Sequence, residues 1–162
     1  MTGSNSDSAA LEQRALAAYE ADRYDEAIDL FRSARSATDD PLKSAELANS
    51  LSVILLKEDR NTEALDIVRG TPQVFEAEGD IGRQARATGN LASALEACGE
   101  LDEAEKAYRE AADLLEMSKE SWLNLSKEEY KLLFHQSAVE RAGYDKLKGN
   151  MAFLQKKQES KG

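Results

Sequence analysis

Cysteine, histidine and proline are scarce in this sequence, and each shortage excludes a class of structure. The 162 residues include one cysteine, Cys98, and one histidine, His135. A single cysteine forms no intrachain disulfide and fits a reducing compartment. A zinc site or a catalytic Cys-His pair would have to join these two distant residues, so we expect no metal, no cofactor and no enzymatic activity. The 2 prolines leave room for long helices.

Long apolar runs are missing as well. No stretch approaches the length of a membrane-spanning helix. Residues 1–8, MTGSNSDS, lack the basic and apolar parts of a secretory signal, and we expect this opening segment to be disordered. Together with the single cysteine, these absences predict a cytoplasmic protein that does not bind a membrane.

Positive charge is scarce over most of the chain. Residues 1–120 contain 26 acids and 13 bases, a net charge of -13, whereas residues 121–162 contain 5 acids and 8 bases, a net charge of +3. A field this negative repels a phosphate backbone and argues against nucleic acid as a partner. It favours a neutral or basic protein or peptide. The basic C-terminal run is more simply a solvated helix end than a binding site.

Alanine, glutamate, leucine and lysine are abundant, and 32% of the residues are charged. This composition, with few prolines and glycines, predicts an all-α protein. A chain of 162 residues is long enough to bury one continuous core, so we expect a single folding unit.

One short segment occurs three times along the chain. The copies are AYEADRYDEAIDLF at 18–31, LLKEDRNTEALDIV at 55–68 and LEACGELDEAEKAY at 95–108. Each copy contains a residue suited to a left-handed turn between two helices. These turn residues are Asp22, Asp59 and Gly99.

The second half of each copy predicts the start of a helix. Asp25, Thr62 and Asp102 are residues that can cap a helix N-terminus with a side-chain oxygen. An acid follows each of them, and then an alanine that we expect where two helix backbones approach closely. The alanines Ala27, Ala64 and Ala104 are 37 and 40 residues apart, which is the period of a helix pair.

These copies resemble the tetratricopeptide repeat family. By this resemblance, residues 9–118 hold three repeats, at 8–40, 45–78 and 85–118. The resemblance implies an α-α superhelix, a solenoid of about three helix hairpins that bury their core by stacking. The chain departs from the family where an aromatic residue is expected early in each first helix. The residues in those places are Leu11, Ala48 and Thr88.

Two further regions depart from the repeat. Gly70 and Pro72 interrupt the second helix of the second repeat, where Thr71 and Pro72 can instead open a new short helix. We expect residues 119–157 to form C-terminal capping helices, because solenoids cover their last apolar face with atypical terminal elements. Residues 158–162 are expected to be a disordered tail.

The resemblance also implies a peptide-binding groove, because the first helices of this family line a concave face. Asn49 and Asn90 suit hydrogen bonds to an extended peptide backbone, and Arg86 suits a carboxylate. Leu16 and Val53 fit contact with a ligand and packing against a neighbouring helix equally well. The family register places in the groove Glu12, Leu16, Tyr19, Asn49, Ser50, Val53, Leu56, Arg86, Asn90, Ser93 and Glu96.

Three kinds of function compete for this sequence. The repeat favours a non-catalytic adaptor or scaffold that holds a peptide or helix of a partner protein in the groove. The alternative is a peptide-sensing regulator whose solenoid changes shape on binding, with residues 121–162 as its output element. An enzyme or metal protein has no recognisable site here. Self-association through an exposed apolar groove stays open.

Overall fold

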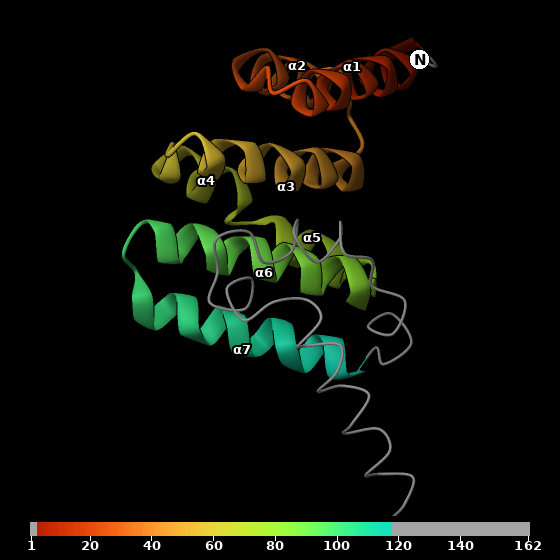
Figure 1. Cartoon of the computed structure of the whole chain (residues 1–162). Helices are drawn as coiled ribbons and strands as arrows, with labels where there is room; N and C mark the ends of the chain where they lie inside the picture. The colour runs from red at the N-terminus through yellow and green to blue at the C-terminus, as the bar shows by residue number, and fades with distance from the viewer. Residues whose placement is uncertain (1–2, 118–162) are drawn as a thin grey trace, which may run out of the picture.

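The computed structural model describes residues 3–117, and the regular structure of this part of the chain is entirely helical (Figure 1). The predicted all-α fold is therefore confirmed for these residues. The predicted capping helices at 119–157 and tail at 158–162 lie outside them. None of the described helices combines the length and the apolar character needed to cross a membrane. The helices are α1 (Gly3–Glu20), α2 (Tyr24–Ser36), α3 (Pro41–Lys57), α4 (Asn61–Val68), α5 (Thr71–Ala77), α6 (Ile81–Ala97) and α7 (Leu101–Met117).

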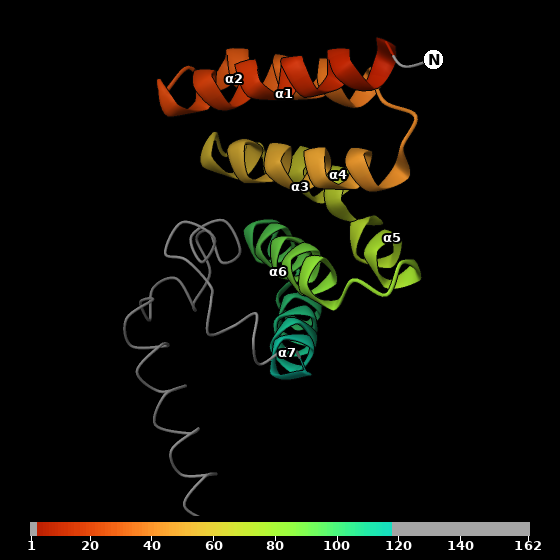
Figure 2. The same ribbon diagram turned by 90° about the vertical axis from the view of Figure 1, so that its right-hand side faces the viewer.

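Helices that follow one another pack as pairs, and the pairs lie in successive layers (Figure 1). Helix α1 packs on α2, α3 on α4, and α6 on α7. The pairs are joined by contacts of α2 with α3 and of α4 with α6. Figure 2 shows α6 and α7 nearly end-on while α1 and α3 run across the view, so the third pair is rotated relative to the first two.

Each pair reverses direction through a left-handed residue, as predicted. The φ angles are 58° at Asp22, 56° at Asp59 and 81° at Gly99. The residue after each of them donates its amide to a carbonyl five residues earlier, which satisfies the end of the first helix. These bonds are Arg23 to Ala18, Arg60 to Leu55 and Glu100 to Leu95, at 2.8 to 2.9 Å. A fourth left-handed turn, at Gly79 with φ 70°, was not predicted and separates α5 from α6.

Replacing Asp59 with glycine should leave the free energy of unfolding unchanged or raise it slightly. A left-handed backbone costs a residue with a side chain about 1–2 kcal/mol, and glycine avoids that cost. The larger freedom of glycine in the unfolded chain offsets part of the gain. The matched control is exposed Glu58, whose φ is -94°. Urea unfolding should show a loss of about 0.4–1 kcal/mol for Glu58→Gly. An equal loss for Asp59→Gly would contradict the argument.

The predicted caps of the second helices are wrong. Helices α2, α4 and α7 begin one residue before the predicted caps, so Asp25, Thr62 and Asp102 lie inside the first turn. The residues that precede α2 and α4, Arg23 and Arg60, make no side-chain capping bond. The acids of these first turns still lie at the positive end of the helix dipole, which stabilises them electrostatically.

Side-chain caps instead open the first helices of the second and third pairs. The Asp40 carboxylate accepts a hydrogen bond from the amide of Leu42 at 3.0 Å, with Pro41 as the first residue of α3. The Asp80 carboxylate accepts one from the amide of Arg83 at 2.9 Å and caps α6. The polar stretches between pairs therefore start helices as well as ending them.

The opening segment also differs from the prediction. Helix α1 begins at Gly3, so residues 3–8 are helical where we expected disorder. The Ser8 side chain is fully buried, and its hydroxyl donates a hydrogen bond to the carbonyl of Ala34 at 2.8 Å. This bond ties α1 to the end of α2, which a reading of sequence composition could not reveal.

One main core runs through the stacked pairs, and the three repeat alanines belong to it. Ala27, Ala64 and Ala104 are 0%, 0% and 2% exposed, as predicted for close helix crossings. The predicted short helix after the break is also confirmed, as α5. It packs on α3 and α6, and there Phe75 forms a smaller core cluster with Ala45.

Candidate functional site

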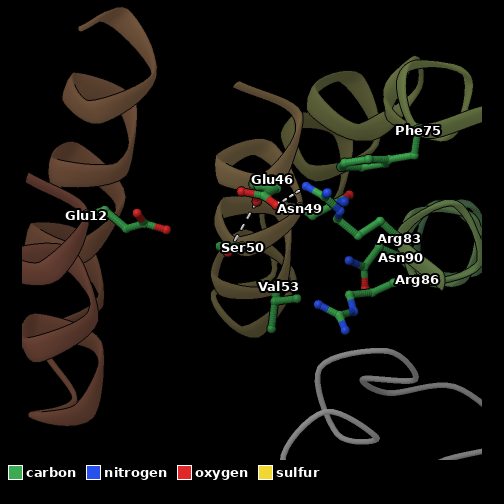
Figure 3. A pocket seen from close by; sticks show the side chains of 9 residues that line it. All are labelled: Glu12, Glu46, Asn49, Ser50, Val53, Phe75, Arg83, Arg86 and Asn90. Atoms are coloured by element: carbon green, nitrogen blue, oxygen red, sulfur yellow. Dashed lines mark hydrogen bonds and ion pairs between the residues drawn. The ribbon is translucent and has the colours of Figure 1, made fainter. Parts of the chain in front are cut away.

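A pocket of about 210 Å³ opens among α1, α3, α5 and α6 (Figure 3). This volume is below the roughly 300–1,000 Å³ of small-molecule sites. It fits one or two side chains, or a short stretch of peptide backbone. The lining residues are Glu12, Glu46, Asn49, Ser50, Val53, Phe75, Arg83, Arg86 and Asn90.

Six of the predicted groove residues meet in this pocket. They come from three different first helices, α1, α3 and α6, which the stacking of the pairs brings side by side (Figure 3). Val53, which fitted both groove and core, lines the pocket and is only 4% exposed. The six residues are Glu12, Asn49, Ser50, Val53, Arg86 and Asn90.

Two predicted groove residues belong to the packing between helices. Leu56 is 1% exposed and lies in the main core, so the prediction that it lines the groove is wrong. Ser93 is 5% exposed and donates its hydroxyl hydrogen to the Gly89 carbonyl at 3.1 Å. Its oxygen lies 3.3 Å from the hydroxyl of Tyr108 on α7. Ser93 therefore faces the other helix of its own pair.

The other predicted residues lie outside the pocket lining. Leu16 is 45% exposed on α1. Tyr19 packs beside Tyr24 with ring centroids 5.7 Å apart, and the Lys57 ammonium lies 5.3 Å from the Tyr19 ring. Glu96 accepts a hydrogen bond from the Tyr108 hydroxyl at 2.7 Å. Tyr19 and Glu96 therefore join helices instead of lining the pocket, and Leu16 lies on the surface.

Three lining residues were missed, and two of them carried a usable signal. Glu46 lies one helical turn before Asn49 and Ser50, and Arg83 one turn before Arg86, so each shares a helix face with a predicted residue. Phe75 carried no such signal. It reaches the pocket because the chain breaks at Gly70 and turns α5 toward α6.

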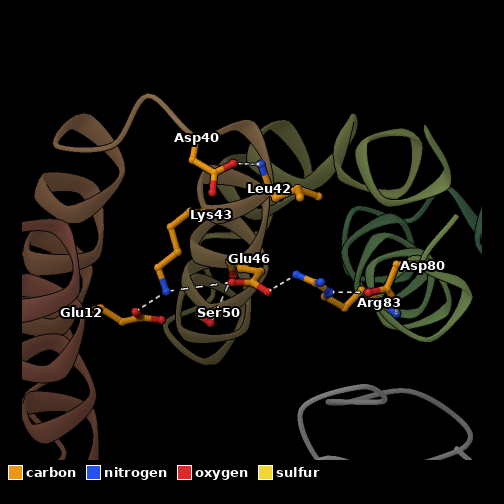
Figure 4. Close-up of polar contacts among 8 residues, drawn as sticks. All are labelled: Glu12, Asp40, Leu42, Lys43, Glu46, Ser50, Asp80 and Arg83. Carbon is orange, nitrogen blue, oxygen red and sulfur yellow. Dashed lines mark hydrogen bonds and ion pairs between the residues drawn. The ribbon is translucent and has the colours of Figure 1, made fainter. Parts of the chain in front are cut away.

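A chain of ion pairs forms one rim of the pocket and crosses all three pairs (Figure 4). Lys43 of α3 pairs with Glu12 of α1 and lies 3.9 Å from the Glu46 carboxylate. Arg83 of α6 binds Glu46 at 2.5 Å and Asp80 at 2.6 Å. Exposed pairs contribute little stability one by one, but together they fix the orientation of these side chains.

The electrostatic consequence is clearest at the α6 end of this rim. The main-chain amide of Arg83 and its guanidinium group both donate hydrogen bonds to Asp80. They lower the pKa of that carboxyl below its usual value, and the amide has the larger effect. Hydrogen bonds to Asp80 and Glu46 raise the pKa of Arg83 in turn. Its guanidinium carbon also lies 5.6 Å from the centre of the Phe75 ring. Arg83 is thus held on the rim by two acids and an aromatic face.

The Asn90 carboxamide is the most unusual group in the pocket. Asn90 is 4% exposed, and its side chain points from α6 into the pocket (Figure 3). Among the described residues its carboxamide makes no hydrogen bond. Because the amide borders the pocket, its NH₂ group and its oxygen offer a donor and an acceptor to an incoming group.

Asn49 lies across the pocket on α3 and is held by the first residue of α5. The Thr71 hydroxyl lies 3.0 Å from Oδ1 of Asn49 and 3.0 Å from the Val68 carbonyl oxygen. The usual helical donor to that carbonyl would be the amide of residue 72, which is Pro72 and has none. Thr71 therefore compensates for the helix break and orients Asn49, whose amide NH₂ remains for the pocket.

Replacing Thr71 with valine should lower the free energy of unfolding by about 1–3 kcal/mol. The methyl group fills the same space but removes the one hydroxyl hydrogen that the Asn49 oxygen and the Val68 carbonyl share. Chemical denaturation measures the loss. Thr71→Ser keeps the hydroxyl and is the control, with a smaller loss expected. If serine and valine destabilise equally, the hydroxyl does not hold the two acceptors.

Comparisons with known proteins assign no role to the pocket residues, so the chemistry of the pocket is inferred from the residues themselves. No family model matches the sequence, and no curated protein matches it significantly. The polar lining consists of two carboxamides, two carboxylates, two guanidinium groups and the Ser50 hydroxyl. That hydroxyl donates to the Glu46 main-chain carbonyl at 3.3 Å. Within residues 3–117, no group of three or more acids, histidines or cysteines is placed to hold a metal ion.

Proposed function

We propose that this protein is a non-catalytic interaction module, an adaptor or scaffold, that holds a peptide or helix of a partner protein in the pocket. The Asn90 carboxamide, which faces the pocket without a hydrogen-bond partner among the described residues, carries this proposal. A peptide unit supplies both the acceptor and the donor that such an amide needs. Asn49 offers a second carboxamide on the facing helix.

The repeat supports the same proposal through the architecture that it implies. Left-handed turns and buried alanines recur in all three helix pairs, at the positions that the repeated segment predicts. We interpret the array as an α-α superhelix of this type. In such a solenoid the first helices α1, α3 and α6 form one wall, and the pocket residues lie along it.

The charge of the chain indicates which partners suit this wall. Residues 1–120 carry a net charge of -13, which attracts a basic peptide, tolerates a neutral one and repels nucleic acid. The lining carboxylates of Glu12 and Glu46 already pair with Lys43 and Arg83. We therefore propose hydrogen bonding to the peptide backbone as the main contact, in a cytoplasmic protein.

A peptide-sensing regulator is the second candidate, and the rim favours it. Its ion pairs connect α1 to α3 and α3 to α6, so they span the contacts between pairs. A ligand that competes for Glu12 or Glu46 would change how one pair is held on the next. The affinity of the protein for an effector should then depend on whether the peptide is bound.

Selection from a displayed library of random peptides, with the full chain as bait, tests the proposed function. Enriched peptides should bind the wild type and bind Asn90→Leu at least about tenfold more weakly, equal to about 1.4 kcal/mol. The control is Gln13→Leu, an exposed position on α1, which should bind as the wild type does. The proposal fails if no peptide is enriched, or if all three proteins bind with equal affinity.

A further inference from the structure

The last described pair carries an open apolar hollow away from the pocket. The hollow has a volume of about 350 Å³ and lies along α7 at the edge of α6. Leu101, Ala104, Tyr108 and Ala112 of α7 line it, with Glu96 of α6 at its border. Leu101 is 63% exposed there. No described residue outside α6 and α7 lines the hollow.

The repeat shows that the same helix face is covered in the two earlier pairs. The residue after the repeat alanine is Ile28 in α2 and Leu65 in α4, and these are 1% and 4% exposed. In each case the next pair supplies a helix that packs there, α3 on α2 and α6 on α4. In α7 the matching residue is Glu105, which is exposed and pairs with Arg109. The third pair therefore keeps an apolar face but has a polar residue at its centre.

We propose that residues 118–162 of the same chain pack on this hollow. They follow α7 directly after Met117, so they are tethered beside the hollow at an effective concentration of the order of millimolar. Their charge is opposite in sign, because residues 121–162 carry +3 whereas the hollow is bordered by Glu96 and by Glu105 with its partner Arg109, a net charge of -1. They also contain an apolar repeat at helical spacing, with Tyr130, Leu133 and Phe134.

The hollow is separate from the pocket, so this inference does not rest on the proposed function. A second copy of the chain or a free partner protein would have to compete with a tethered segment. A charged residue at Ala112, which is exposed in the described structure, would interfere with apolar packing there. Trp122 is the only tryptophan of the chain and lies within the proposed segment, so its fluorescence reports the packing selectively.

The test compares Ala112→Asp with Ala17→Asp in the full chain. Both alanines are exposed on helices, but Ala17 lies on α1, far from the hollow in sequence and outside its lining. Hydrogen exchange of residues 118–162 should rise at least tenfold in Ala112→Asp, and Trp122 emission should move to longer wavelength. Neither should change in Ala17→Asp. Leu101→Asp, at a more exposed position, should repeat the result if Ala112→Asp folds poorly.

Two results would overturn the proposal. Exchange and emission that stay at wild-type values in both Ala112→Asp and Leu101→Asp would show that the segment does not pack on the hollow. Sedimentation that reveals a wild-type dimer, converted to monomer by the same two substitutions, would assign the hollow to a second copy of the chain.

Discussion

Replacing Phe75 with alanine should lower the free energy of unfolding by about 3–5 kcal/mol. Phe75 is 1% exposed and fills the space among α3, α5 and α6, where it contacts Ala45 and Ala87. The two buried neighbours, Ala45 and Ala87, are too small to fill the cavity left by the ring. The seven-residue α5 has little other buried side-chain area with which to stay docked.

Chemical denaturation of the purified full chain measures this loss, and Phe75→Leu is the control. Leucine keeps most of the apolar volume, so its cost should stay below about 1.5 kcal/mol. The alanine variant should also bind selected peptides more weakly, because the ring supports Arg83 at the pocket rim. Equal stability of the alanine and leucine variants would show that α5 does not depend on this ring.

Replacing Ala104 with leucine should cost about 1–3 kcal/mol, because the larger side chain overpacks a helix crossing. Ala104 is 2% exposed and belongs to the main core with Ala64 and Ala27. Ala112 is on the same helix and is exposed, so leucine should be tolerated there within about 0.5 kcal/mol.

Thermal unfolding of the two α7 variants side by side decides whether the repeat register is right. The register predicts a clearly lower melting temperature for Ala104→Leu than for Ala112→Leu. Both substitutions add the same side chain to one helix, so helix propensity cancels from the comparison. Equal melting temperatures would mean that the repeat alanines do not mark helix crossings.

The parts of the fold that the sequence predicted well are those set by local backbone demands. A turn between two packed helices needs a left-handed residue, and Asp22, Asp59 and Gly99 are among the few residue types that adopt it. Crossing helices need a small residue, and the repeat spacing identified Ala27. Such signals lie within a few residues, so one sequence is enough to find them.

The capping prediction failed because an acid near a helix start has two roles that look alike in sequence. Asp25 lies in the first turn, where it interacts with the helix dipole, whereas Asp80 accepts the amide of Arg83 and caps α6. One residue of displacement separates these roles, and helix boundaries cannot be read from sequence to that precision.

The candidate site could be predicted only in part, because it depends on how the helix pairs stack. The position of a residue on a first helix correctly identified Asn49 and Asn90 as pocket residues, but it also placed Leu56 in the groove. The error arose because the stacking of the pairs decides which face of a helix is covered, and sequence position does not show this. The contribution of Phe75 depends on where the chain goes after Gly70, and that is a tertiary result.

The side-chain amide signals of Asn49 and Asn90 give the most direct test of a peptide-binding pocket on the wall of first helices. They can be followed by nuclear magnetic resonance in the full chain while a selected peptide is added. Both signals should shift with saturation, and the NH₂ protons of Asn90 should exchange more slowly as the amide gains a partner. Signals that stay unchanged while shifts gather on α2 or the outer face of α7 would contradict the account.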